Sequence, residues 1–135
     1  MTDPVGYSGK PLIQKLGLKD GQVLKPIDAP EGYCDWIDPL PFGAVVDAAA
    51  DQADLVHLFV RDRAALEREA TPALTAVRHS GMLWVSWPKK ASPLFRDLTE
   101  DGLRAVLLPT GWVDVKVCAV SADWSGLKFL KRKAT

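Results

Sequence analysis

The clearest indication of fold class in this chain is the segment Gly81-Met82-Leu83-Trp84-Val85-Ser86-Trp87-Pro88-Lys89-Lys90. A glycine typical of turns comes first, six mostly apolar residues follow at 82–87, and a proline and two lysines end the run. Strands buried on both faces of a parallel sheet lose the alternation of polar and apolar residues that half-exposed strands show. The pattern therefore predicts a buried strand of a parallel sheet. In such sheets, ligands bind just beyond the carboxyl ends of the strands.

Segments on both sides of this stretch predict strands and helices in alternation. Apolar runs predict strands at 22–28 and 53–60, and 44–47 reads as a short edge strand after an irregular region at 30–43. Helical spacing predicts helices at 11–16, at 61–79 and from Thr99 to the residue before Pro109. Because Pro72 lies inside the second helix, we expect a kink or a break there, with Thr71 capping the second half. His79 would close this helix.

The last quarter of the chain predicts a hairpin. Val113, Val115 and Val117 alternate with polar residues and Cys118. We therefore expect a strand with one buried and one solvent-exposed face. A final strand from Trp124 to about residue 131 would pair with it in antiparallel orientation. Strands alternating with helices predict an α/β fold, here a three-layer, Rossmann-like and mostly parallel sheet that ends in an antiparallel hairpin.

Composition limits the classes of function. The 135 residues suit a single domain over 1–135. The 17 basic and 17 acidic residues cancel, so we predict no nucleic-acid partner. The basic residues near the end are interpreted as a solvated tail: Lys128, Lys131, Arg132 and Lys133.

Cys34 and Cys118 are expected to be free thiols. No apolar run reaches the roughly 20 residues of a membrane span, and no apolar leader is seen, so we expect a cytoplasmic protein without a membrane partner.

The strand ends predict a candidate ligand rim of mixed charge. If the sheet is right, one edge brings together Asp28, Glu31, Tyr33, Arg61, Trp87, Lys89 and Lys90. Such a rim would suit a small anionic or zwitterionic ligand, with Trp87 available for stacking. The alternative is that Lys89 and Lys90 form a solvated loop. Gly6 to Gly9 would be a lead-in or a flap over the rim.

No catalytic or metal-binding residues are predicted. His57 is expected to be a hydrogen-bonded core residue, and neither histidine has a second ligand at metal-binding spacing. Cys118 is interpreted as a structural thiol, although Lys116 could lower its pKa. The chain has neither a Gly-x-Ser-x-Gly elbow nor a phosphate-binding loop of the Gly-x-x-x-x-Gly-Lys-Ser/Thr type. Trp84 is expected to pack under a helix.

The order of elements resembles the second half of the class I methyltransferase fold, with a truncated first half. Only 25 residues lie between Asp28 and Asp54, too few for two complete strand–helix units. The resemblance implies S-adenosylmethionine as a candidate cofactor, held over a glycine-rich turn after the first strand. The matching turn here, 28–33, keeps only Gly32, and Pro30 removes an amide donor. The turn therefore argues against that cofactor.

Several phrases also resemble a bacterial family designated domain of unknown function 3052. The strongest phrases are 81–89, 114–120 and 124–129; the others are 6–12, 15–17 and 57–59. This resemblance implies a cytoplasmic protein and carries over no catalytic residues. The leading hypothesis is a non-catalytic or small-ligand-binding domain on a degenerate methyltransferase-like fold. The alternatives are an S-adenosylmethionine-dependent enzyme whose pocket a partner chain or a dimer completes, and a structural subunit whose hairpin edge pairs with another copy or a partner.

Overall fold

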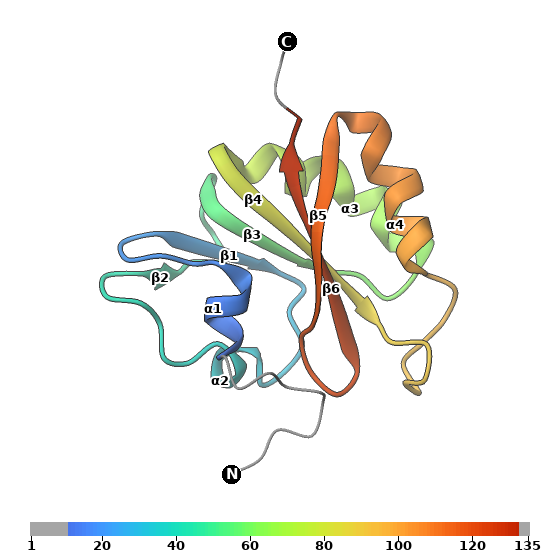
Figure 1. The fold of residues 1–135 in the computed structure, drawn as a ribbon, viewed down its shortest axis with the longest axis horizontal. Helices are drawn as coiled ribbons and strands as arrows, with labels where there is room; N and C mark the ends of the chain where they lie inside the picture. Colours follow the sequence, from blue (N-terminus) through green and yellow to red (C-terminus); the bar gives the residue numbers. More distant parts are fainter. Residues whose placement is uncertain (1–10, 133–135) are drawn as a thin grey trace.

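The computed structural model describes residues 11–132, which fold around one six-stranded sheet. The strands are β1 (Val23–Ile27), β2 (Val45–Val46), β3 (Ala53–Phe59), β4 (Val77–Pro88), β5 (Trp112–Ala119) and β6 (Trp124–Lys131). Their order across the sheet is β2-β1-β3-β4-β6-β5 (Figure 1). The first four strands pair in parallel, and β6 runs antiparallel to both of its neighbours, β4 and β5. The predicted mostly parallel sheet with an antiparallel carboxyl-terminal hairpin is confirmed.

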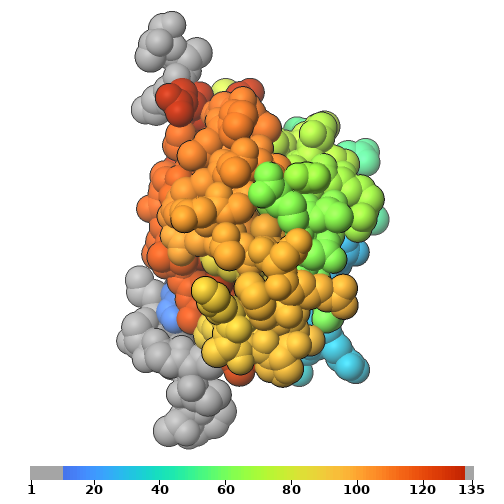
Figure 2. All heavy atoms as spheres, turned by 90° about the vertical axis from the view of Figure 1, so that its right-hand side faces the viewer, coloured from blue at the N-terminus to red at the C-terminus, as the bar shows by residue number. Residues whose placement is uncertain are grey.

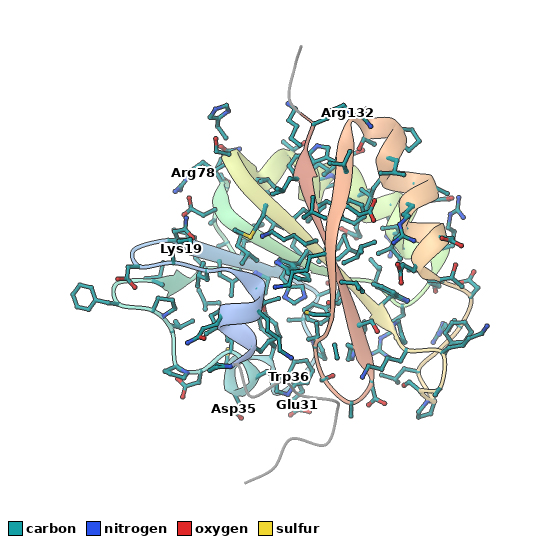
Figure 3. The ribbon with its side chains drawn as sticks, in the orientation of Figure 1. Lys19, Glu31, Asp35, Trp36, Arg78 and Arg132 are labelled. Atoms are coloured by element: carbon teal, nitrogen blue, oxygen red, sulfur yellow. The ribbon has the colours of Figure 1, made fainter. Side chains whose placement is uncertain are left out.

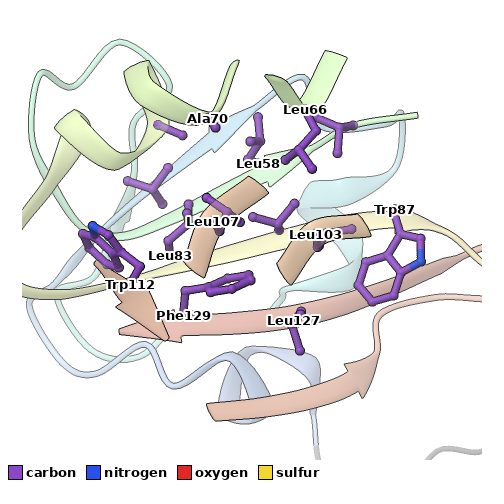
Figure 4. Close-up of a cluster of buried hydrophobic side chains, with 14 of the residues drawn as sticks. Leu58, Leu66, Ala70, Leu83, Trp87, Leu103, Leu107, Trp112, Leu127 and Phe129 are labelled. Atoms are coloured by element: carbon purple, nitrogen blue, oxygen red, sulfur yellow. The ribbon is translucent and has the colours of Figure 1, made fainter. Parts of the chain in front are cut away.

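Helices cover both faces of the sheet. The helices are α1 (Leu12–Leu16), α2 (Tyr33–Trp36), α3 (Arg63–Ala76), α4 (Glu100–Leu107) and the short 3₁₀ helix η1 (Leu108–Thr110). On one face, α3 and α4 pack on a cluster that includes Leu83, Val85 and Trp87 of β4 (Figure 4). On the other face, α1 and α2 pack on a second cluster that includes Trp84. The fully buried β4 side chains thus alternate between two apolar layers, because successive strand residues point to opposite faces.

Trp84 connects the sheet to α1, as its apolar surroundings in the sequence predict. The ring is fully buried, and its Nε1 donates a hydrogen bond of 2.8 Å to the carbonyl oxygen of Leu16. Trp87 lies on the opposite face of the same strand and is only 6% exposed. Its ring therefore belongs to the core under α3 and α4.

The helix expected at 61–79 is shorter than predicted and has no break. The Asp62 side chain caps it by accepting a hydrogen bond of 2.8 Å from the amide of Ala65, so Thr71 is not a cap. Pro72 lies inside the continuous helix on its exposed side, where water can hydrogen-bond the carbonyl group that loses its donor. Because Val77 already begins β4, the prediction that His79 closes the helix is wrong.

Gly81 lies where β4 changes its register against β3. Ala53 pairs with Val77 but Leu55 pairs with Met82, so the intervening β4 residues bulge out of the ladder. A Cβ atom on Gly81 would lie 2.7 Å from the carbonyl oxygen of Asp54. The glycine is therefore required by a close approach between two backbones.

The edge strand β5 departs from the expected alternation. Val115 and Val117 are 50% and 52% exposed, although their spacing predicted a buried face. A register shift between Asp114 and Lys116 places Val115 in a bulge, and no strand among residues 11–132 pairs with the outer edge of β5. The prediction failed because it assumed a regular strand.

Four further expectations concern separate parts of the chain. Thr99 caps α4 by accepting a hydrogen bond from the amide of Gly102, as predicted. Cys34 and Cys118 are free thiols. Between residues 11 and 132, no helix has the length and apolar character needed to cross a membrane. The expected lead-in or flap at Gly6 to Gly9 lies outside the described residues.

Candidate ligand-binding site

A hollow opens where the order of strands reverses. From β1 the chain goes to β2 on one side, then crosses to β3 on the other side, so β1 and β3 flank a topological switch point. In open α/β sheets, ligands bind outside the carboxyl ends of the strands at this point. A hollow of about 380 Å³ lies there, within the size range of small-molecule pockets. Its polar and aromatic walls come from Asp28, Phe59, Arg61, Asp62, Arg68, Arg96 and Trp124.

Four separate segments position these side chains. Asp28 directly follows β1 and has a φ of 58°, a left-handed conformation that aspartate tolerates better than most residues. Arg61 follows β3, and Asp62 begins α3. Trp124 opens β6. The guanidinium carbon of Arg61 lies 5.7 Å from the centroid of the Trp124 ring, a cation–π contact that holds both side chains at the wall.

The segment after β4 carries Arg96 to the hollow and is held at both ends. The amide of Lys89 donates to the carbonyl oxygen of Asp123 at 2.8 Å. Near the other end, the carboxylate of Asp97 accepts from the amide of Arg63 at 3.0 Å. Arg96 then lies 3.7 Å from the carboxylate of Asp62. Figure 2 shows this side of the molecule, where the gold segment before α4 lies against the green start of α3.

The charges around the hollow favour a ligand that carries negative charge and can also carry one positively charged group. Three guanidinium groups and two carboxylates line the hollow. Arg96 pairs with Asp62 at 3.7 Å, and Arg68 pairs at 3.4 Å with Glu69, which lies outside the lining. The amino-terminal end of the 14-residue helix α3 adds partial positive charge at the same place. Guanidinium groups bind carboxylates and phosphates in two-point geometry. The arrangement therefore suits a small anionic or zwitterionic molecule.

Aromatic rings form one wall of the hollow and continue into the core. Phe59 lines the hollow and meets the Trp124 ring edge-on at 5.1 Å. His57 stacks on Phe59 at 4.3 Å, and Tyr33 of α2 packs edge-on against both rings at 5.3 Å. The wall of the hollow is thereby joined to α2 by continuous ring contacts.

Beneath these rings lies a buried chain of hydrogen bonds. The hydroxyl of Tyr33 lies 2.8 Å from His57 Nδ1, and His57 Nε2 lies 2.7 Å from the hydroxyl of Ser86. Burial lowers the pKa of His57 to about 3 and raises the pKa of Tyr33 well above its usual value. Both groups are therefore neutral near pH 7. The prediction that His57 is a hydrogen-bonded core residue is confirmed.

Of the seven residues predicted for the rim, the structure brings Asp28 and Arg61 to the hollow. Tyr33 is buried in the ring contacts described above, and Trp87 is buried on the opposite face of the sheet. Glu31 is exposed in the turn before α2 and lies beside Asp35 and Trp36 in Figure 3. Lys89 and Lys90 follow β4 outside the lining of the hollow.

Five polar or aromatic wall residues were missed by sequence reasoning: Phe59, Asp62, Arg68, Arg96 and Trp124. Asp62 could have been found, because it follows Arg61 directly and precedes a helix that needs a cap. Arg68 lies on the first turns of the same helix. No local signal marks Arg96 or Trp124, because only the tertiary fold brings the segment before α4 and the start of β6 to this edge.

The polar residues of the hollow fit part of an adenosyl amino acid such as S-adenosylmethionine. Asp28 could hold an amino group, and the guanidinium groups could hold a carboxylate. Against this, the turn at 28–33 offers one glycine, Gly32, with a φ of 90°, and Pro30 has no amide hydrogen. Within residues 11–132, no group of three or more His, Cys, Asp or Glu side chains could hold a metal ion.

Comparison with known proteins relates the chain to others through its fold. No protein-family model and no curated protein sequence matches it, so the resemblance to domain of unknown function 3052 stays a prediction. Solved structures do match. A possible exported protein from Bordetella parapertussis has a TM-score of 0.65 at 13% identity, over 90% of this chain and 66% of that protein. This chain thus spans about two thirds of that protein's length.

Two further neighbours are methyltransferases. A SAM-dependent methyltransferase from Aquifex aeolicus has a TM-score of 0.59 at 9% identity, over 87% of this chain and 86% of the enzyme. The N-methyltransferase NodS from Bradyrhizobium japonicum WM9 has a TM-score of 0.56 at 10% identity, over 90% of this chain and 93% of the enzyme. At these identities the likeness shows the methyltransferase-like fold alone.

Proposed function

We propose that this protein binds a small anionic or zwitterionic molecule in the hollow between β1 and β3, and that it catalyses no reaction on that molecule. The observation that carries the proposal is the position of the hollow at the topological switch point, with Asp28, Arg61 and Trp124 in its wall. Arg61 is already held against Trp124, so less side-chain freedom is lost on binding. A single domain and a cytoplasmic location are parts of the same proposal.

The chemistry of the lining supports binding rather than catalysis. The polar side chains that line the hollow carry carboxylates and guanidinium groups, and a guanidinium group stays protonated in proteins. General acid–base catalysis works best with a group whose pKa lies near the working pH. His57 and Tyr33 are residue types that can act as general acids or bases. Both are buried and hydrogen-bonded to each other, and burial moves the pKa of each further from 7.

Methyl transfer from S-adenosylmethionine is the second candidate function. The methyltransferases among the structural neighbours favour it, as does the partial fit of Asp28 and the guanidinium groups to an adenosyl amino acid. The turn at 28–33 opposes it, because a glycine-poor turn with Pro30 offers fewer backbone amides to the ligand.

Ligand binding to the full chain tests the proposal. We expect at least one of S-adenosylmethionine, S-adenosylhomocysteine, a nucleotide or a carboxylate amino acid to raise the thermal midpoint. At about 100 times the dissociation constant, a ligand adds about 2.7 kcal/mol to the free energy of unfolding, a shift of several degrees. Arg61→Gln and Asp28→Asn should weaken this ligand at least about tenfold. Asparagine tolerates the left-handed conformation at residue 28.

Lys90→Gln is the matched control, because Lys90 belongs to the rim predicted from sequence but lies outside the lining of the hollow. Its affinity should equal that of the wild type. Equal affinities of Arg61→Gln, Asp28→Asn and Lys90→Gln would move the site out of the hollow. Transfer of a labelled methyl group from S-adenosylmethionine to any component of a cell extract would replace the binding proposal with the enzymatic one.

A further inference from the structure

Lysine side chains gather on the face of the sheet that α1 covers, outside the lining of the hollow. Lys128 of β6 lies directly opposite Lys116 of β5 in the antiparallel register. Its neighbours Leu127 and Phe129 belong to the cluster under α3 and α4, so Lys128 points to the other face. There its Nζ lies 3.8 Å from the place that a Cβ atom on Gly17 would occupy, just beyond the end of α1.

Two more lysines come from α1 and the turn after it. Burial lowers the pKa of Lys128, and the positive charges of Lys116 and Lys19 lower it further. Lys19 follows α1, as labelled in Figure 3. Burial raises the pKa of Cys118, which lies across from Gly126 on the same two strands, and the charges of Lys15 and Lys116 oppose that rise. Lys19, Lys116 and Lys128 therefore form one group, the lysine cluster, and Lys15 of α1 acts on the neighbouring Cys118.

The lysine cluster is unfavourable for the isolated fold. Like charges directly opposite each other on paired strands are destabilising. Within residues 11–132, no salt bridge to an acidic side chain involves Lys19, Lys116 or Lys128. A lysine on an edge strand protects that edge from pairing with other chains, which accounts for Lys116. It does not account for Lys128, which is half-buried on an inner strand rather than part of a solvated tail.

We propose that the lysine cluster binds a compact anion with at least two adjacent phosphate groups. Ammonium groups bind phosphate as point charges. Lys116 lies opposite Lys128 on the paired strands, and the Lys128 amine lies beside Gly17, two residues before Lys19. Phosphates joined to each other concentrate negative charge over a similarly small area. A nucleic acid would need an extended basic surface, but this chain carries no net charge and its cluster is local. Carboxylates of an acidic peptide are spread along a flexible chain and match the cluster less well.

Titration of the full chain with pyrophosphate at constant ionic strength tests the proposal. We expect saturable binding that Lys128→Met and Lys116→Gln each weaken at least about tenfold. Methionine keeps an unbranched apolar stem at residue 128, so the packing beside Gly17 and Met82 is preserved. Lys90→Gln is the matched control and should bind as the wild type does. Each variant's thermal midpoint without ligand is measured first, which separates lost binding from lost folding.

A second readout follows the Lys128 amine by nuclear magnetic resonance. A bound phosphate favours the charged form, so pyrophosphate should raise the pKa of Lys128. An unchanged pKa at saturation would overturn the proposal. So would equal binding of pyrophosphate and sulfate, tighter binding of duplex DNA or polyglutamate than of pyrophosphate, or binding that Arg61→Gln abolishes and Lys128→Met leaves intact. The last result would assign the phosphate to the hollow, so failure of this inference is distinguishable from failure of the proposed function.

Discussion

At the scale of single residues, His57 joins three elements through its side chain. Its two ring nitrogens contact Tyr33 of α2 and Ser86 of β4, while the residue itself belongs to β3. A neutral imidazole offers one donor and one acceptor, which two hydroxyl partners can satisfy together. A positively charged ring would have to be buried among aromatic side chains without a counter-ion. The neutral form is therefore part of the folded structure.

This burial makes the stability of the protein depend on pH. The pKa of His57 is about 3 in the folded chain, against 6.5 for an unperturbed histidine. Between these values the unfolded chain binds a proton that the folded chain does not. The free energy of unfolding should then fall as the pH drops from 6.5 towards 3, by on the order of 1 kcal/mol per pH unit.

Urea unfolding at a series of pH values measures this slope. His57→Gln should remove the part of this pH dependence that His57 causes. Glutamine keeps polar atoms near both hydroxyl groups but does not titrate. The matched control is His79→Gln, since His79 is exposed on β4. A slope that survives in His57→Gln and disappears in His79→Gln would contradict the assignment.

At the scale of elements, β4 combines two kinds of backbone. Its second half is a regular buried strand between β3 and β6. Its first half contains the bulge, where Ser80 has a φ of 66° and Gly81 approaches the backbone of the neighbouring strand. Bulges bend a strand and increase its twist. The bulge thus connects the first residues of β4, directly after α3, to the half of β4 whose side chains pack into both apolar clusters.

Gly81→Ala should lower the free energy of unfolding by about 2 to 3 kcal/mol, in the range for overpacked sites. A Cβ atom there would lie 2.7 Å and 2.8 Å from the carbonyl oxygens of Asp54 and Arg78, and backbone atoms cannot move aside as a side chain can. Urea unfolding at pH 7 measures the loss. The neighbouring change Ser80→Gly should preserve or raise stability, because glycine adopts a positive φ without strain. Equal stability of Gly81→Ala and the wild type would show that the bulge relaxes.

At the scale of the whole molecule, the hollow and the lysine cluster are built from different residues. The hollow lies at the carboxyl ends of β1 and β3, whereas the lysine cluster lies across β5, β6 and the end of α1. The two sets share no residue. Independent sites contribute additively to stability when each ligand binds only the folded chain.

The thermal midpoints of two variants test this separation. With a ligand of the hollow and pyrophosphate both present at about 100 times their dissociation constants, each should add about 2.7 kcal/mol to the free energy of unfolding. A site weakened tenfold still adds about 1.4 kcal/mol at these ligand concentrations. Arg61→Gln should therefore lose half or more of the first increment and none of the second, and Lys128→Met half or more of the second and none of the first. If either variant loses both increments, the two sites are coupled through the sheet.

The local elements and their order follow from residues that are close together in the amino-acid sequence. The apolar run at 82–87 specified a buried strand, Thr99 specified the start of α4, and the position of His57 among apolar residues indicated a core histidine. These signals were readable because strand burial, helix capping and periodicity depend on residues close together in the chain. The end of α3 and the bulges in β4 and β5 were not readable, because they depend on contacts with neighbouring strands.

Which side chains lie next to one another depends on the three-dimensional fold. Asp28 and Arg61 reach the hollow because parallel strands end at the same edge, and that rule could be applied from sequence. Arg96 and Trp124 join them from distant segments whose paths no local pattern encodes. Trp87 was assigned to the rim, but the face of the strand on which it lies buries it under α3 and α4. The opposition of Lys116 and Lys128 likewise depends on a register that a single bulge sets.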